Sequence, residues 1–277
     1  MSSNFITQKR GGAKAQGNGE EKMIEVRDLF AGYGGADVIC NINFTAQGGE
    51  SLCVLGPNGC GKSTLLKSIA RVIDYRGAVL MDGENVSAMA RKELAKKIAM
   101  LNQNASVYFP YTVYETVSMG RYAWSRGLPH CGLKDLSAAD EEIIENILIK
   151  LDIGDIRKRM IDELSGGTLQ RVFLARTLAQ TPDLILLDEP ANHLDLKHQI
   201  ELLNLLKAWV KDNHKTLISV FHDLNLARQF SDTAIVLHNG AIAANGKIDE
   251  VLNSEILSGV YGIDIRAFMR ESLGKWN

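Results

Sequence analysis

The sequence predicts an α/β fold in which a three-layer core carries an antiparallel β subdomain and an inserted α-helical subdomain. Three observations favour this class. Short apolar runs alternate with segments of helical periodicity along most of the chain, which is typical of helices packed on a sheet. The first two predicted strands instead follow one another closely, with a glycine pair between them. Residues 105–160 interrupt the alternation with an aromatic stretch and two successive helical patterns.

Length and composition set the limits of the interpretation. The chain has 277 residues and 45% hydrophobic content, enough for one large domain or two tightly joined subdomains. Its net charge of -2, from 31 basic and 33 acidic residues, gives no global reason to expect nucleic acid as a partner. No apolar run approaches the roughly 20 residues that cross a bilayer, and we expect neither a secretion signal nor a fused membrane domain. The four cysteines fall in no CxxC pair or metal-ligand spacing, which favours reduced thiols in a cytosolic compartment.

The strands and the helix of the first half of the chain are predicted from apolar patterns and from the glycines between them. Residues 1–22 are rich in Gly, Ser, Asn and charged side chains, so we expect a disordered tail. Helical spacing of Leu65, Leu66, Ile69 and Val72 predicts a helix directly after a glycine-rich loop. Strands are predicted at 24–29, 38–44, 51–55, 79–81 and 97–101.

The second half begins with the predicted helical subdomain. Helical patterns cover 112–119 and 138–151, and Ser137 with Asp140 predicts a capping box at the second. Further helices are predicted at 166–179 and 196–210, and strands at 184–187, 217–221, 235–237 and 241–243. Little chain follows the last strand pair, so we expect no large regulatory domain at the C-terminus.

A phosphate-binding loop is predicted between the strand 51–55 and the helix that follows it. The segment satisfies G-x-x-x-x-G-K-S/T in the required context of strand, loop and helix. Its residues are Gly56, Pro57, Asn58, Gly59, Cys60, Gly61, Lys62, Ser63 and Thr64. Glycines let the backbone N–H groups surround a polyphosphate, while Lys62 reaches the β- and γ-phosphates and the Ser63 hydroxyl ligates Mg²⁺. The alternative is a glycine-rich turn without a ligand.

Two acidic residues close the buried-type strand 184–187. Asp188 and Glu189 therefore lie at the carboxyl edge of the sheet, where α/β proteins bind ligands. Phosphoryl transfer depends on positioning and charge neutralisation, so we expect Asp188 to hold Mg²⁺ and Glu189 to orient or deprotonate the attacking water. A solvated acidic strand end is the alternative.

Residues 164–171 read Leu-Ser-Gly-Gly-Thr-Leu-Gln-Arg and open the predicted helix 166–179. With the phosphate loop upstream and the acidic strand just downstream, the sequence resembles the ATP-binding cassette (ABC) family, whose signature begins LSGG. The resemblance implies a P-loop NTPase (RecA-like) core over 23–260, with 261–277 as a C-terminal extension. It also implies that Ser165, Gly166 and Gly167 bind the ATP held by a second copy of the chain. Thr168 stands where the family usually carries Gln or Glu, which puts signalling from this loop in question.

Four single residues match positions of the same family. The resemblance implies that Gln103 senses Mg²⁺ and the nucleophilic water, and that His222 contacts the γ-phosphate and stabilises Glu189. It implies that Tyr33 stacks on adenine and that Asp195 communicates across the dimer. Taken singly, a solvated glutamine, a structural histidine and a packed tyrosine are the alternatives.

The resemblance also implies a biological task. A single uninterrupted cassette is typical of uptake systems, in which two copies dock beneath two membrane permease subunits on the cytoplasmic face and an extracytoplasmic binding protein delivers the substrate. Residues 111–124 resemble ATPases that import iron-siderophores, haem and cobalamin. The aromatic residues of the insert either line a groove for a permease helix or pack inside the subdomain. An exporter ATPase, or a cassette protein acting on DNA or ribosomes, is the alternative.

Overall fold

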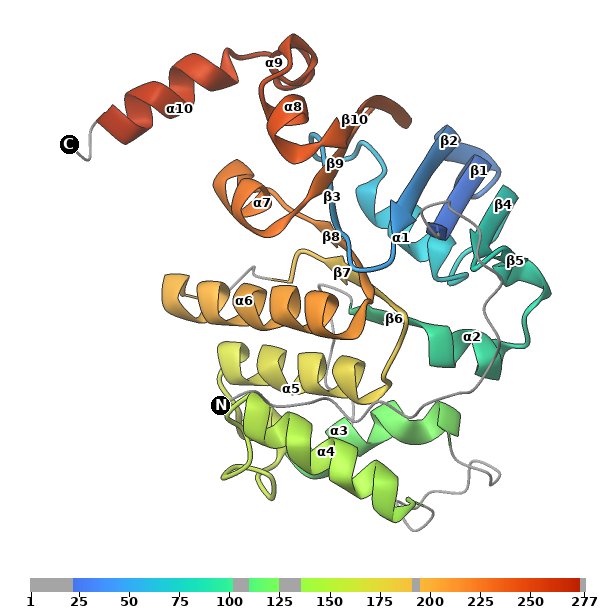
Figure 1. Ribbon diagram of the computed structural model, residues 1–277, viewed down its shortest axis with the longest axis vertical. Helices are drawn as coiled ribbons and strands as arrows, with labels where there is room; N and C mark the ends of the chain where they lie inside the picture. The colour runs from blue at the N-terminus through green and yellow to red at the C-terminus, as the bar shows by residue number, and fades with distance from the viewer. Residues whose placement is uncertain (1–21, 102–109, 125–135, 191–194, 275–277) are drawn as a thin grey trace.

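The computed structural model describes residues 22–101, 110–124, 136–190 and 195–274. A six-stranded sheet has the order β10-β9-β3-β8-β7-β6 and is parallel except for its edge strand β10 (Figure 1). Its strands are β3 (Ser51–Leu55), β6 (Ile98–Leu101), β7 (Leu184–Asp188), β8 (Thr216–Val220), β9 (Thr233–His238) and β10 (Ala241–Lys247). Every residue of β3, β7 and β8 is buried, as expected for a sheet covered on both faces.

Alternate residues of β3 separate the two faces of this sheet. Leu52 and Val54 join the hydrophobic cluster that includes α1 (Lys62–Ile69) and the β subdomain. Cys53 and Leu55 join the cluster formed with α5 (Gly166–Ala179) and α6 (Leu196–Asn213). The two clusters confirm the predicted three-layer core.

A second, antiparallel sheet has the order β2-β1-β4-β5 and lies beside α1 (Figure 1). Its strands are β1 (Lys22–Tyr33), β2 (Ala36–Gln47), β4 (Tyr75–Met81) and β5 (Glu84–Asn85). The Cys40 backbone N–H donates to the Gly240 carbonyl at 2.8 Å, which ties β2 to the turn between β9 and β10. The predicted antiparallel β subdomain is confirmed.

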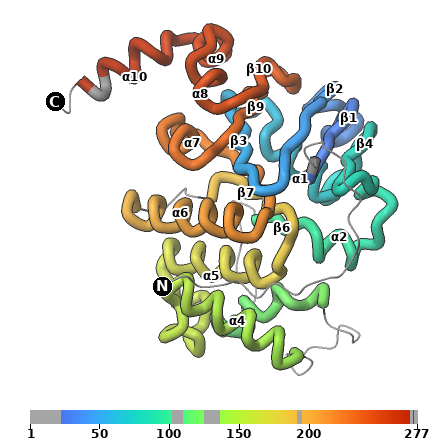
Figure 2. The backbone as a smooth tube through the Cα atoms, viewed as in Figure 1, coloured from blue at the N-terminus to red at the C-terminus, as the bar shows by residue number. Residues whose placement is uncertain are grey.

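The helical subdomain comprises α3 (Val113–Ser118), the 3₁₀ helix η2 (Met119–Trp124) and α4 (Ala138–Lys150), packed on α5. Capping boxes begin both α-helices: Thr112 with Glu115 at α3, and Ser137 with Asp140 at α4. The predicted box at Ser137 is therefore confirmed. In Figures 1 and 2 these helices lie together, beyond α5 from the central sheet.

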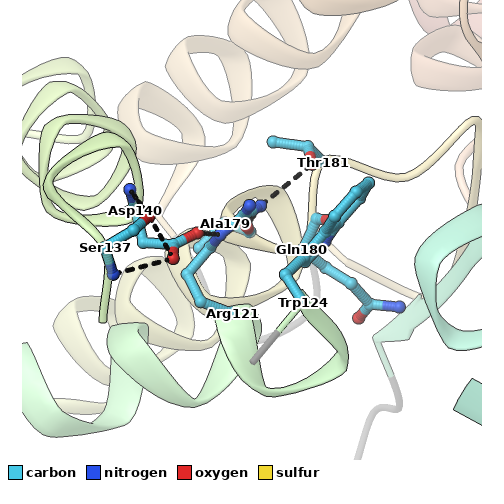
Figure 3. Close-up of polar contacts among 7 residues, drawn as sticks. All are labelled: Arg121, Trp124, Ser137, Asp140, Ala179, Gln180 and Thr181. Carbon is cyan, nitrogen blue, oxygen red and sulfur yellow. Dashed lines mark hydrogen bonds and ion pairs between the residues drawn. The ribbon is translucent and has the colours of Figure 1, made fainter. Parts of the chain in front are cut away.

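A buried polar junction fixes this subdomain to the carboxyl end of α5 (Figure 3). Arg121 Nε donates to Asp140 Oδ1 at 2.7 Å, and Arg121 Nη1 donates to the Ala179 carbonyl at 2.8 Å. Trp124 Nε1 donates to the Gln180 carbonyl at 2.9 Å. The Gln180 side chain in turn donates to a carbonyl of β6 at 2.8 Å, so the helical subdomain and the central sheet meet at this point.

Several helices were not predicted, because each is short or carries little apolar periodicity. They are α2 (Arg91–Lys97), α7 (Leu224–Phe230), α8 (Ile248–Leu252), α9 (Glu255–Tyr261) and α10 (Ile265–Gly274), with the 3₁₀ turns η1 (Val86–Ala88) and η4 (Ile161–Glu163). The expected continuation of α1 to Val72 was wrong: Arg71 takes a left-handed φ of 54°, and Val72 is 61% exposed. Residues 1–21 of the predicted tail lie outside the described residues. In the described part of the chain, no helix is long and apolar enough to cross a membrane.

Candidate functional site

The predicted phosphate loop joins β3 to α1 and is wedged between neighbouring strands. A Cβ atom on Gly56 would lie 2.2 Å from the Leu237 carbonyl oxygen at the end of β9. A Cβ atom on Gly61 would lie 2.5 Å from the side chain of Ile39 in β2, and both glycines have positive φ angles of 141° and 106°. Only glycine fits these two positions, so the path of the loop is set by the strands on either side.

Lys62 turns back onto the loop that precedes it. Its ammonium group donates to the Gly56 carbonyl at 2.8 Å and to the Pro57 carbonyl at 2.9 Å, and the residue is only 6% exposed. Asn58 and Gly59 at the loop tip are exposed, whereas Cys60 is buried, and that burial raises the pKa of its thiol. A buried cation therefore lies beneath an open backbone loop, which is the arrangement that accepts a polyphosphate.

Asp188 and Ser63 meet where β7 ends beside the start of α1. Asp188 is 6% exposed, and burial raises the pKa of its carboxyl group while a hydrogen bond from Ser63 opposes that rise. Asp188 Oδ1 is buried and has no hydrogen-bond partner among the described residues. A hydroxyl oxygen beside a carboxylate with an unused lone pair fits a hard cation such as Mg²⁺. Thr64, the last residue of the motif, is buried in α1.

Glu189 and His222 come from neighbouring strand ends and contact each other. His222 Nε2 is hydrogen-bonded to Glu189 Oε1, which joins the end of β7 to the residue that follows Phe221. Glu189 has a left-handed φ of 55° directly after the last residue of β7. The structure thus brings together two residues that the sequence analysis proposed separately.

The signature segment begins α5, with Ser165 as its N-cap. Ser165 Oγ accepts a hydrogen bond from the Thr168 backbone N–H at 3.4 Å and lies 2.9 Å from Thr168 Oγ1. Ser165 and Gly166 are exposed, and Gly167 is half-buried. Thr168, the residue that departs from the family pattern, therefore contacts the Ser165 hydroxyl through both its backbone and its side chain.

One further contact places α5 relative to the phosphate site. Gln170 Nε2 donates to the Pro190 carbonyl at 3.1 Å, so the signature helix touches the segment that follows Glu189. The sequence analysis did not single out Gln170. In Figure 1, α5 lies in the helical layer next to α6, whereas α1 follows β3 on the side of the β subdomain.

The remaining predicted residues have different environments. Tyr33 ends β1 with 51% of its surface exposed, so it is not a packed core residue. Asp195 is the N-cap of α6, where Oδ1 accepts from the His198 backbone N–H at 2.9 Å and Oδ2 lies 2.8 Å from His198 Nδ1. Gln103 lies outside the described residues.

One contact to the phosphate loop had no signal in the sequence. The Gly56 backbone N–H donates to the Tyr261 hydroxyl at 3.1 Å, although 205 residues separate the two. Tyr261 ends α9, beyond the boundary at 260 that was expected for the ATPase domain. No local motif marks such a long-range contact, so only the fold reveals it.

Comparisons with known proteins agree with this geometry. The sequence model of the ABC transporter family matches residues 39–192. The chain is 38% identical to a petrobactin import ATP-binding protein of Bacillus subtilis over 244 residues, 88% of this chain and 94% of the relative. It is 38% identical to a hemin import ATP-binding protein of Rhodopseudomonas palustris over 258 residues, 90% of this chain and 91% of the relative. A solved structure described as an inward-facing ABC transporter of metal-chelate type superposes with a TM-score of 0.74 at 28% identity, covering 87% and 89% of the two chains. The predicted ABC ATPase fold is confirmed, and this chain belongs to the ABC transporter family as an ATP-binding protein.

Proposed function

We propose that this chain is the ATPase subunit of an importer and energises uptake of a metal chelate (an iron-siderophore, haem or cobalamin) through a separate permease. The observation that carries the ATPase half is the convergence of the phosphate loop, the Asp188–Ser63 pair and the Glu189–His222 pair at one edge of the sheet. The transport half is supported by the relatives, which include import proteins for petrobactin, iron(3+)-hydroxamate and hemin.

The phosphate loop holds the nucleotide in this proposal. Backbone N–H groups of residues 56–64 surround the phosphates, and Lys62 exchanges its two carbonyl partners for β- and γ-phosphate oxygens. Ser63 and Asp188 would hold Mg²⁺, with Gln103 as the third residue assigned to it from the sequence, and the cation would neutralise charge on the phosphates. The exposed ring of Tyr33 stacks on the adenine.

Glu189 and His222 carry the hydrolysis step. Glu189 accepts a proton from, or orients, the water that attacks the γ-phosphorus in line with the leaving oxygen. His222 holds the Glu189 carboxylate through their hydrogen bond and donates toward the γ-phosphate. Both side chains act from strand ends, so their geometry is set by the sheet and not by a long loop.

The signature residues act on a second copy of the chain. Ser165, Gly166 and Gly167 lie at the N-terminus of a 14-residue helix, the first two exposed and the third half-buried, where free N–H groups and the helix dipole favour an anion. We assign them to the ATP bound by the other copy, in a head-to-tail homodimer, and assign Asp195 to communication between the copies. The pair docks beneath two permease subunits at the cytoplasmic face of the membrane. The permease receives substrate from an extracytoplasmic binding protein, and no nucleic acid takes part.

Exposed side chains of the helical subdomain supply the surface for the permease. Tyr111, Met119, Tyr122 and Trp124 are 36–57% exposed, whereas Tyr114 packs against the core cluster. Only Tyr114 has the packed environment considered from the sequence, and we assign the exposed side chains to the permease surface. Large exposed apolar side chains are favoured anchors at protein interfaces.

The test is an uptake assay in cells whose only copy of this chain carries Glu189→Gln. The variant is expected to bind ATP normally, to hydrolyse it at least about a hundredfold more slowly, and to stop uptake of one of the three labelled chelates. The wild-type chain is expected to co-purify with a polytopic membrane protein. If cells carrying only Glu189→Gln took up iron-siderophore, haem and cobalamin at normal rates, the importer assignment would be contradicted.

A further inference from the structure

Helices α8 and α9 pack on the core, and α10 is anchored to it by its first residue, Ile265. Ile248 and Val251 of α8, Leu257 of α9 and Ile265 of α10 are all buried in the cluster that includes α5 and α6. The Ile248 backbone N–H also donates to the Asp232 carbonyl at 3.1 Å, next to the start of β9. In Figure 1, α8 and α9 lie next to the edge strand β10. The end of α9 is therefore held at a defined place.

At that place Tyr261 reaches the first residue of the phosphate loop. Its hydroxyl oxygen accepts the Gly56 N–H at 3.1 Å, while the Gly56 carbonyl accepts the Lys62 ammonium at 2.8 Å. Gly56 is thus held from both sides, by Tyr261 of α9 through its N–H and by Lys62 through its carbonyl. Both bonds act on the residue from which the loop leaves β3.

The Tyr261 hydroxyl supplies a partner that Gly56 needs. Gly56 is buried, and its close approach to the Leu237 carbonyl leaves no room for a side chain. A buried N–H without a partner is costly, so loss of the hydroxyl favours other positions of the loop. Burial raises the pKa of Tyr261 further above its ordinary value, so the hydroxyl stays protonated at the site.

We propose that Tyr261 is a positioning residue of the nucleotide site and couples ATP binding to the docking of α9. The proposal rests on ATP binding by the loop 56–64. Coupling between two sites is reciprocal. If the docked Tyr261 favours the loop conformation that binds phosphate, ATP must in turn stabilise the docking of α9.

The experiment compares two substitutions that each remove a single hydroxyl group from the full-length chain. Tyr261→Phe removes the partner of Gly56. Tyr75→Phe is the matched control, since Tyr75 Oη is buried in β4 and has no hydrogen-bond partner within the described ranges. By calorimetry, we expect the Kd for ATP to rise roughly three- to tenfold in Tyr261→Phe, the range for one hydrogen bond, and to stay unchanged in Tyr75→Phe.

Hydrogen exchange supplies the readout that a merely structural role would not move. ATP is expected to slow amide exchange across α9 in the wild type and in Tyr75→Phe, and to lose this effect in Tyr261→Phe. A Tyr261→Phe variant with a lower Tm but wild-type ATP affinity and wild-type protection of α9 would overturn the proposal. A wild-type chain that failed to bind ATP would refute the loop assignment itself, which is a different result from failure of the coupling alone.

Discussion

The phosphate loop and the signature segment are the two halves of an ATP site, and this chain builds them in opposite ways. The two ends of the loop are buried between β9 and β2, and the loop already carries a buried cation, since Lys62 is 6% exposed. The signature is exposed, and its capping Ser165 contacts only Thr168 among the side-chain bonds described. The loop is thus equipped to hold phosphate by itself, whereas the signature presents donors to a ligand from outside the chain.

The helix that begins at the exposed signature segment, α5, is nevertheless held in place at its carboxyl end. The carboxyl end of α5 is fixed by Arg121, which bridges Asp140 and the Ala179 carbonyl, and by Trp124 and Gln180 (Figure 3). A 14-residue helix that is rigid at one end transmits its position to the other. Binding by the loop and presentation by the signature are therefore separable properties, and substitutions can remove one without the other.

The largest effect is expected from Lys62→Ala, which removes the buried cation of the loop. Charge-assisted hydrogen bonds are each worth about 1.5–3 kcal/mol, so the loss of two is expected to weaken ATP binding by roughly two to four orders of magnitude. Calorimetric titration with Mg·ATP measures the change, with the exposed Lys211→Ala of α6 as control. An affinity within threefold of wild type would show that the loop does not bind through Lys62.

Ser165→Arg is expected to leave ATP affinity within about threefold of wild type, because the signature lies apart from the loop. Hydrolysis should fall by about a hundredfold, since a bulky side chain at the helix start blocks donors that act on transition-state charge. Single-turnover hydrolysis assays measure this, and Ser165→Thr, which keeps the capping hydroxyl, should stay near the wild-type rate. If Ser165→Arg lost ATP binding by the monomer, the two halves would not be separable.

Arg121→Ala tests whether the Arg121 junction holds the signature helix α5 in position. Removing one partner of a buried ion pair costs about 3 kcal/mol, and Arg121 is 6% and Asp140 13% exposed at the side chain. Urea unfolding measures that loss, and we expect faster hydrogen exchange in α4 and α5 with ATP affinity unchanged. The control Arg157→Ala breaks an exposed pair with Glu145 and should cost less than about 1 kcal/mol. Equal losses in the two variants would show that the junction does not hold α5.

The same junction predicts a pH dependence. Burial raises the pKa of Asp140, but hydrogen bonds from Ser137 and Arg121 outweigh it, so the pKa lies below its usual value. A carboxyl group whose pKa is lowered on folding contributes stability above its unfolded pKa of about 4, and that contribution is lost as the pH falls through the folded value. The difference in unfolding free energy between wild type and Asp140→Asn should therefore shrink below about pH 4. A difference that stays constant from pH 7 to pH 3 would contradict this.

Local patterns in the sequence predicted much of the fold because the core elements carry strong signals. The strand at 51–55 and the helix at 166–179 have their predicted bounds, since a short apolar run and a serine cap mark them without tertiary help. Helices α7, α8 and α9 span only 5–7 residues each and pack on the core, so they are too short for apolar periodicity to reveal them.

For the candidate site too, contiguous motifs were predicted from the sequence and contacts between distant segments were not. The loop and the acidic strand end are contiguous motifs, and they were found from the sequence. The contact between Glu189 and His222 depends on the order of β7 and β8 in the sheet, and the bond from Gly56 to Tyr261 depends on where α9 docks. Pairings that join distant segments require the fold, because no local preference encodes them.

The central claim is that one chain holds the ATP and a second copy completes the site. The most direct measurement is light scattering of Glu189→Gln with and without Mg·ATP, in parallel with Glu189→Gln/Ser165→Arg. With ATP, the measured mass of Glu189→Gln should double from the 30.5 kDa of one chain, with one ATP bound per chain. The mass of the double variant should stay at 30.5 kDa although it binds ATP. If Glu189→Gln bound one ATP per chain and still remained at 30.5 kDa, the shared site would be contradicted.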